Sequence, residues 1–328
     1  MPNKKKGKNI VVIGGGTGTS VVLEGLKKYP VNLSAIITTA DDGSSSGKLR
    51  REFDMIPPGD IRQCLVALAS RDFGYLNERF QRGSLQGHTL GNLLITLFSE
   101  KHKNFQEAID ELLLMTGARG SLIPMTLRPA TLVAKLNNGR TLKGEKNITT
   151  SRDISTKLSN LYITPKNIPA NPRAVSAIAS ADVIVVGPGN LFSSILPNFL
   201  VSGIRRAMIS SRAKKIYVAN LFTQPGHTDG FTLKDFVDTL CGYIGKDVFT
   251  DIIYNNRKIS ESMVRKYKNS IIASPLISPS GNKEERFIGR SIARSAPRIL
   301  KADPMASTRN PFLHDSNKLA KIIIELCE

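Results

Sequence analysis

The chain has 328 residues, a length that fits one large domain or two modest ones. With 41% hydrophobic and 22% charged residues, its composition is that of a globular protein and excludes a disordered, collagen-like or coiled-coil chain. The 46 Lys and Arg residues exceed the 27 Asp and Glu residues and give a net charge of +19, which points to an anionic partner.

A lysine-rich leader opens the chain, and residues 1–8 are predicted to be a disordered basic tail. The leader runs into a short apolar segment without the features of a signal peptide, and no apolar run approaches the roughly 18 residues of a membrane span. We therefore expect a cytoplasmic protein. The three cysteines are far apart and the four histidines lack H-x-x-x-H spacing, which argues against a disulfide framework and against zinc.

Short β-branched segments alternate with helical patterns, which predicts βαβ units in a Rossmann-like, doubly wound, mostly parallel α/β sheet. Strands are expected at residues 9–13, 33–39, 182–186, 216–220 and 251–254. Helices are expected at residues 19–28, 60–69, 90–100, 105–115, 172–179, 233–243 and 316–327. Most of the strands end at a loop rich in Gly, Asn, Asp or Thr, where open α/β sheets bind their ligands.

Two stretches depart from this alternation. Residues 131–146 contain two short strands around an Asn-Gly turn, which predicts a β-hairpin inserted as an appendage into a single α/β domain of residues 9–328. Residues 278–312 are rich in Ser, Pro, Arg and Lys with little periodicity, and we expect a long surface excursion, partly disordered or ordered by a partner.

A glycine-rich loop follows the first strand. Backbone amides at a helix N-terminus carry partial positive charge and glycine lets a phosphate approach, so the loop predicts a nucleotide site. Its candidate residues are Gly14, Gly15, Gly16, Thr17, Gly18 and Thr19. No lysine follows Gly18, which excludes a Walker A loop and ATP hydrolysis by its mechanism. The dinucleotide fingerprint fits Gly14 and Gly16 but has Thr19 at its third glycine, which leaves NAD binding as an alternative.

The second strand ends at an acidic, hydroxyl-rich loop. Asp41 lies about 20 residues beyond the glycines, where an acidic residue accepts a hydrogen bond from a ribose hydroxyl, and the pair Asp41-Asp42 is equally suited to a divalent cation. Ser44 and Ser45 are candidates for contacting a diphosphate. These residues extend the predicted nucleotide site.

The segment that begins at Asp60 has two interpretations. Asp60 and Gln63 match a capping box at a helix start. Alternatively, Asp60 is a second metal carboxylate and Arg62 a phosphate contact. Two later loops are expected beside the glycines and could shape a base or sugar pocket through Gly187, Gly189, Asn190, Asn220 and Thr223.

Six blocks in one order carry a family resemblance: IGGGTGTS, TTADDGSSSGKLR, PPGDIRQCLVALAS, GHTLGNLL, ADVIVVGPGNLFSSILPN and NLFTQPGHTDG. Together they resemble the gluconeogenesis factor family, which is related to the 2-phospho-L-lactate transferases. The resemblance implies a nucleotide bound across the strand ends. In the gluconeogenesis factor branch, to which PPGDIRQC belongs, it implies a UDP-sugar such as UDP-N-acetylglucosamine and a role in cell shape and cell-wall precursor metabolism during gluconeogenic growth.

The resemblance also assigns single residues. It implies that Asn92 and Tyr267 contact the nucleotide, and, from the transferase branch, that Asp42 and Asp60 hold an ion such as Mg²⁺. Four positions depart from the family pattern and bear on ligand affinity, namely Asn190, Phe192, His227 and Leu313.

Several functions remain open at this point. Because no nucleophile and base are evident, we expect a regulatory UDP-sugar-binding protein without turnover. The alternatives are a metal-dependent transferase of the 2-phospho-L-lactate type and an NAD-dependent oxidoreductase. Basic residues are spread along the chain and Trp is absent, so specific nucleic-acid binding is not expected. A homo-oligomer and regulatory protein partners are further expectations.

Overall fold

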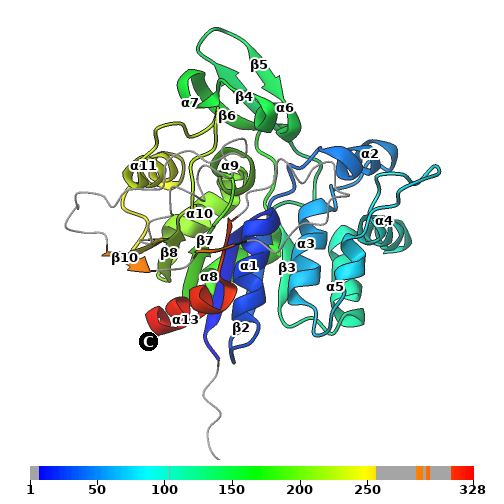
Figure 1. Ribbon diagram of the computed structural model, residues 1–328, viewed down its shortest axis with the longest axis horizontal. Helices are drawn as coiled ribbons and strands as arrows, with labels where there is room; N and C mark the ends of the chain where they lie inside the picture. The colour runs from blue at the N-terminus through cyan, green and yellow to red at the C-terminus, as the bar shows by residue number, and fades with distance from the viewer. Residues whose placement is uncertain (1–6, 103, 256–285, 291–292, 296–311) are drawn as a thin grey trace, which may run out of the picture.

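A seven-stranded, entirely parallel sheet forms the centre of the computed structural model, which describes residues 7–102, 104–255, 286–290, 293–295 and 312–328 (Figure 1). Its strand order is β10-β9-β8-β7-β1-β2-β3. The strands are β1 (Asn9–Gly14), β2 (Asn32–Ile37), β3 (Ser121–Pro124), β7 (Val183–Val186), β8 (Lys214–Val218), β9 (Asp251–Asn255) and β10 (Arg286–Arg290). The expected Rossmann-like parallel α/β sheet is confirmed.

The order in which successive strands are added to the sheet reverses at β1. It passes from β1 outward to β2 and β3, then returns to pair β7 with the other edge of β1, so that Ile10 faces Leu33 on one side and Val183 on the other. Open α/β sheets bind ligands beyond the carboxyl ends of their strands at such a switch point. The topology thus selects the crevice between the loops after β1 and β7.

Helices cover both faces of the sheet, and their bounds are α1 (Gly16–Leu26), α2 (Ser44–Glu52), α3 (Gly59–Leu68), α4 (Leu90–His102), α5 (Phe105–Met115), α8 (Pro172–Ala179), α9 (Leu196–Leu200), α10 (Ser202–Ser210), α11 (Leu233–Ile244) and α13 (Ser316–Cys327). Successive side chains of a strand point to opposite faces. Accordingly Ile10 and Val12 pack in a core with α1, α3, α4, α5 and α13, while Val11 and Ile13 pack in a second core with α8, α9, α10 and α11. These uninterrupted apolar strands are what a doubly covered parallel sheet requires.

A separate antiparallel sheet stands above the carboxyl edge, at the top of Figure 1. It comprises β4 (Thr131–Leu136), β5 (Thr141–Lys143) and β6 (Leu158–Thr164), with the short helices α6 (Glu145–Thr150) and α7 (Ile154–Lys157) between β5 and β6. The predicted hairpin is confirmed as β4 and β5, and β6 pairs with β4 as a third strand that the sequence did not predict. Leu132 and Ile148 join the second core, so this sheet packs directly on the main fold.

Residues 286–290 correct one expectation. They lie within the predicted surface excursion, yet β10 pairs in parallel with β9 as the sheet's outer strand. Its sequence, RFIGR, carries charged residues, as edge strands often do, and therefore lacks the apolar pattern of the inner strands. Farther along, β11 (Ala293–Ser295) pairs antiparallel with β12 (Phe312–His314).

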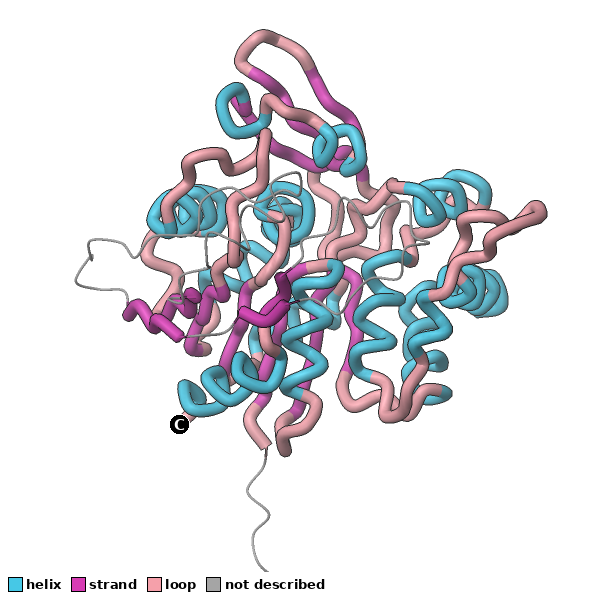
Figure 2. Tube along the Cα trace, in the orientation of Figure 1, coloured by secondary structure: helices cyan, strands magenta, loops and turns pink. Residues whose placement is uncertain are grey.

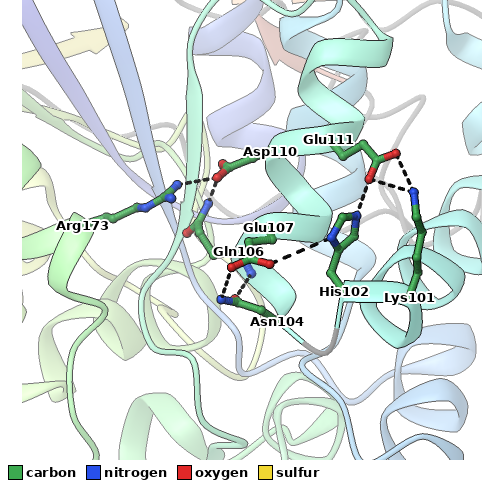
Figure 3. A network of polar contacts seen from close by, with 8 residues as sticks. All are labelled: Lys101, His102, Asn104, Gln106, Glu107, Asp110, Glu111 and Arg173. Atoms are coloured by element: carbon green, nitrogen blue, oxygen red, sulfur yellow. Dashed lines mark hydrogen bonds and ion pairs between the residues drawn. The ribbon is translucent and has the colours of Figure 1, made fainter.

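Loops crowd the carboxyl edge of the main sheet, as the tube in Figure 2 shows. At the β3 edge, polar contacts tie α4, α5 and α8 together (Figure 3). Lys101 donates to Glu111 at 3.0 Å, and Arg173 at the start of α8 pairs with Asp110 of α5. In the part of the chain that the structure describes, no helix is long and apolar enough to cross a membrane.

Candidate functional site

The glycine-rich segment forms the first turn of α1. The helix begins at Gly16, not at the predicted Thr19, so Thr17, Gly18 and Thr19 lie in the helix itself. Gly15 is an extended N-cap, and no side chain caps the helix there. Gly16 has φ of +64°, a conformation that side chains rarely adopt. The first-turn amides and the positive end of the helix dipole therefore face the strand-end crevice, which is the arrangement that binds phosphate.

The loops after β7 and β8 lie beside the glycines that follow β1, as the sequence predicts. A Cβ on Gly18 would overlap the carbonyl oxygen of Pro188, so the first turn of α1 touches the loop after β7. The backbone N–H of Gly189 in turn donates to Oδ1 of Asn220 in the loop after β8, at 3.3 Å. The structure thus joins the loops after β1, β7 and β8 along one edge.

The Asp60 carboxyl group lies at the N-terminus of α1. A Cβ on Gly15 would lie 2.6 Å from Oδ2 of Asp60, and one on Gly16 would lie 3.3 Å from Oδ1. The predicted capping box is wrong, because α3 begins at Gly59 with Pro58 as its N-cap, and Gln63 instead accepts a hydrogen bond from Thr17 at 3.0 Å. Asp60 therefore stands beside the uncapped amides at the start of α1.

Asp41, in the loop after β2, interacts with Asp60 at the start of α3. Oδ1 of Asp41 accepts the N–H of Gly43 at 2.9 Å, and Oδ2 lies beside Gly59. Burial raises the pKa of Asp41, and the neighbouring Asp42 raises it further. Burial raises the pKa of Asp60 well above its usual range, with Asp41 the strongest charged contributor.

Asp42 has a structural contact that the sequence did not indicate. Its Oδ1 accepts the backbone N–H of Lys146 at 2.7 Å, at the start of α6. Gly144, with φ of +92°, lies so close to Asp42 that a Cβ there would overlap Oδ2. Asp42 therefore anchors the antiparallel sheet to the loop after β2.

Glu145 adds a carboxyl group that sequence reasoning missed. Its pKa is raised to about 7, mainly by burial and in smaller part by the charges of Asp41 and Asp42. Its Oε1 accepts the hydroxyl of Thr149 at 2.6 Å. No motif marks this residue, whose one signal is its place next to the glycine that ends the hairpin.

Arg62, Ser45 and Asn92 meet in one buried network. Nε of Arg62 donates to Oδ1 of Asn92 at 2.9 Å, and Nδ2 of Asn92 donates to the Ser45 hydroxyl at 3.0 Å. That hydroxyl also bonds Nδ1 of His88 at 3.0 Å, while Arg62 reaches Asn77. Arg62 lowers the pKa values of Asp41 and Asp60, so the network places its positive charge beside the carboxyl groups.

Several buried hydroxyls in the strand-end loops lack a hydrogen-bond partner. Oγ1 of Thr39 follows β2, Oγ of Ser193 follows β7 and Oγ1 of Thr223 follows β8. Buried polar side chains are almost always hydrogen-bonded, so an unpaired one requires an explanation. Here three occur in the loops that the topology selects for a ligand.

The remaining residues that the sequence singled out do not gather in one place. Ser44 is exposed, and the backbone oxygen of Asn190 accepts N–H groups from the π-helical turn Leu191–Ile195. Phe192 packs in the second core. Tyr267 lies outside the described residues, and Leu313 is placed only by its backbone, in β12.

The carboxyl groups fit a divalent cation that arrives with phosphate. Among the described residues no three His, Cys, Asp or Glu side chains are arranged to hold a metal by themselves. Mg²⁺, however, is commonly held by one or two carboxylates together with nucleotide phosphates and water. Asp60 offers hard oxygen atoms beside the amides at the start of α1, and Asp41 offers them beside Gly59, next to Asp60 in the chain, which suits that mode.

Comparisons with known proteins agree with this geometry. The profile of the family described as 2-phospho-L-lactate transferase CofD matches residues 10–283. The gluconeogenesis factor of Bacillus subtilis is 35% identical over 322 residues, with 97% of each chain covered. The chain belongs to the gluconeogenesis factor family. Another member of the family, from Halalkalibacterium halodurans, is 41% identical over 266 residues, which cover 80% of this chain and 82% of that one.

Solved structures share this fold. Two crystal structures of a UPF0052 family protein from Bacillus halodurans superpose with TM-scores of 0.85 and 0.87, at 35% identity. Each covers 97% of this chain, and the chain covers 99% and 100% of them. The resemblance stated from the sequence, including the relation to the transferases, is confirmed.

Proposed function

We propose that this gluconeogenesis factor relative binds a UDP-sugar at the carboxyl edge of its sheet, with the diphosphate on the amides at the start of α1. The observation that carries the proposal is the approach of Gly18 to the Pro188 carbonyl, which puts an uncapped helix N-terminus into the topological crevice. Asn220 and Thr223 border the same crevice on the β8 side and would contact the uridine or the sugar.

A divalent cation belongs to the proposed complex. Phosphate at the start of α1 would meet the Asp60 carboxylate, and two anions at that distance repel strongly where water is scarce. Mg²⁺ between the phosphates and Asp41 and Asp60 removes that repulsion. Asp42, which the sequence pairs with Asp60, would then act mainly through α6.

The role that follows is regulatory. A bound UDP-sugar would report the supply of cell-wall precursors and influence cell shape during growth on gluconeogenic carbon. The name of the Bacillus subtilis relative, gluconeogenesis factor, supports this biological setting. We expect the gene to restore such growth in a bacterium that lacks its own gluconeogenesis factor.

Calorimetric titration with UDP-N-acetylglucosamine tests the binding. Gly15→Ala should abolish the heat of binding, because the added methyl group crowds Asp60 and Thr38 beside the first-turn amides. Gly242→Ala is the matched control, since a Cβ there meets open space on α11. Unchanged affinity in a folded Gly15→Ala variant would place the ligand elsewhere.

A transferase of the 2-phospho-L-lactate type is the second candidate, favoured by the pairing of Asp41 with Asp60. Such an enzyme would position a phosphoryl donor and neutralise its charge with the cation. Product formation from a nucleotide-linked phospholactate and a deazaflavin, lost in Asp60→Asn, would establish it. An inactive wild-type protein that binds the UDP-sugar would leave the regulatory role.

A further inference from the structure

An arm of the chain projects between the 3₁₀ helix η1 (Gly74–Asn77) and α4, as the cyan loop beside α4 in Figure 1 shows. We define the arm as residues 79–89. The backbone of the arm bonds to itself, with the N–H of Gly87 donating to the Phe80 carbonyl at 2.9 Å. Every residue from 80 to 87 is exposed, and a Cβ on Gly87 would meet nothing within 4 Å. The arm is therefore a formed element whose length faces solvent.

The base of the arm is fixed to the body of the molecule. Just before the arm, Asn77 accepts a hydrogen bond from Arg62. At its end, Nδ1 of His88 bonds the Ser45 hydroxyl at 3.0 Å, and Thr89 is fully buried. Because both ends are held, the arm is preorganised for a contact outside its own chain.

Exposed apolar side chains gather on the edge of the molecule that carries the arm. There η1 packs against α4, and α4 packs against α5. Nine large hydrophobic side chains are exposed among the described residues, and six of them come from η1, the arm, α4 and α5, namely Tyr75, Phe80, Leu85, Leu97, Leu114 and Met115. Monomeric proteins rarely concentrate exposed apolar side chains in this way, so the edge is an interaction surface.

Two helices supply the second part of this edge, which we call the flank and which comprises Leu97, Lys101, Glu111, Leu114 and Met115. Lys101 of α4 contacts Glu111 of α5 at 3.0 Å (Figure 3). Leu97 lies one helical turn before Lys101, and Leu114 and Met115 lie one turn after Glu111, so apolar side chains from both helices border this ion pair. Leu114 is 82% exposed and Leu97 is 62% exposed, which leaves the flank open to a partner.

Charge selects a second copy of this chain as the partner. The arm contains Arg79 and Arg82 and no carboxyl group, whereas residues 97–115 contain four carboxyl groups and two lysines. A basic arm with exposed Phe80 and Leu85 therefore complements an acidic, apolar flank on the same edge of the same chain. A two-fold axis pairs such a surface with itself. A nucleic acid or an anionic membrane would match the arm but be repelled by the flank.

We propose that two copies of this chain form a two-fold dimer in which the arm of each copy lies on the α4–α5 flank of the other. The apolar side chains of the arm and the flank bury one another and supply the affinity, while the opposite charges set the direction of the arm. Each copy gives one arm and receives one, so the two contacts close the assembly at two chains.

Analytical ultracentrifugation of the full chain tests the dimer. The wild type at micromolar concentration should sediment with twice the mass of one chain. Leu85→Glu on the arm and Leu114→Glu on the flank should each raise the dissociation constant of the dimer by about tenfold or more, because they put a charge into an apolar contact. Ile209→Glu is the matched control, since Ile209 of α10 is 52% exposed and lies outside this edge. A monomeric wild type, or unchanged association in either edge variant, would overturn the proposal.

Mixing the two edge variants tests where each arm lies. A pair made of one Leu85→Glu chain and one Leu114→Glu chain keeps one intact contact, because the arm of the second chain meets the flank of the first. The mixture should therefore contain dimer that neither variant forms alone at the same concentration. Absence of that dimer would overturn the reciprocal exchange of arms.

Amide hydrogen exchange detects the cover on the arm directly. The arm is unaltered in Leu114→Glu but loses the flank of its partner, so exchange of residues 80–87 should be about fivefold faster than in the wild type. Exchange of β1 should be the same in both proteins, which shows that the variant is folded. Equal exchange of residues 80–87 in the wild type and in Leu114→Glu would contradict the proposed contact.

Discussion

His314 is a buried imidazole that the fold holds in its neutral form. Its Nε2 donates to the carbonyl of Ala219, just beyond β8, at 3.0 Å, and it comes from the segment that leads into α13. Its pKa is lowered to about 4 because the effect of burial outweighs that of the Ala219 hydrogen bond, which acts in the opposite direction. Protonation therefore costs free energy in the folded chain but not in the unfolded one.

Folding stability should consequently fall between about pH 6.5 and pH 4 through this residue. In that range His314 binds a proton in the unfolded chain but not in the folded one. The contribution of neutral His314 to the free energy of unfolding is therefore complete above pH 6.5 and shrinks as the pH drops. Between pH 7 and pH 5 the loss should be on the order of 2 kcal/mol. Urea unfolding at pH 7 and pH 5 measures it, and His314→Gln should reduce the difference between the two. The same difference in that variant would assign the acid sensitivity to other groups.

Single residues mark the limit of what could be predicted at the site. The glycine loop and Asp41 were identified because local spacing encodes a strand, a turn and a helix. The different contacts of Asp41 and Asp42 could not be predicted. Adjacent residues in a loop point to different neighbours, which only the tertiary structure determines. Glu145 was missed for the same reason: its neighbours are about 100 residues away in the chain.

Among the elements, helices with strong local signals were predicted nearly residue by residue. Asn171 caps α8 by accepting from Arg173 at 3.0 Å, with Pro172 in the first turn, as the Asn-Pro pair indicates. The helices α9 and α10 were not predicted, since a π-helical turn precedes α9 and interrupts the regular period. The start of α1 was misplaced because consecutive glycines lower helix propensity, which the surrounding packing overrides.

The contact between α1 and α13 depends on a glycine. A Cβ on Gly25 would overlap the carbonyl oxygen of Ser316 and lie 2.8 Å from Cβ of Ala320. Gly25→Ala should therefore destabilise the protein by about 2 kcal/mol through overpacking. Urea unfolding measures this, with Gly242→Ala of α11 as the control. That helical glycine faces open space, so its replacement should stabilise by up to about 1 kcal/mol. Equal effects of the two substitutions would show that helix propensity alone matters.

On the scale of the whole molecule, two sheets are joined through polar contacts as well as through their common core. Nε2 of His227, in the loop after β8, donates to the Thr149 carbonyl of α6 at 3.1 Å, and the same loop receives the N–H of Ser155 at the Gly226 carbonyl, at 3.0 Å. Burial lowers the pKa of His227, so a neutral ring donates to α6. The sequence resemblance implies that an acidic residue is usual at this position in the family, and a carboxylate could not donate to the Thr149 carbonyl.

Removing this donor should loosen the antiparallel sheet. In His227→Ala, amide hydrogen exchange of residues 145–157 should accelerate by about tenfold, while β1 should stay protected. His227→Gln, whose amide group can donate, should restore part of the protection. Asp238→Ala, in an exposed ion pair of α11, is the control for surface substitutions. Unchanged exchange in His227→Ala would mean that the apolar contacts suffice.

The position of β1 between β2 and β7 has a consequence for synthesis of the chain. A nascent chain that has released β1, β2 and β3 lacks β7, so one side of the central strand is an unpaired apolar edge of the kind that other chains can join. When Val183–Val186 emerges and pairs with Ile10–Ile13, that edge is covered and the crevice beside the glycines forms in the same step. Cover of the apolar edge and formation of the crevice therefore begin at the same point of translation.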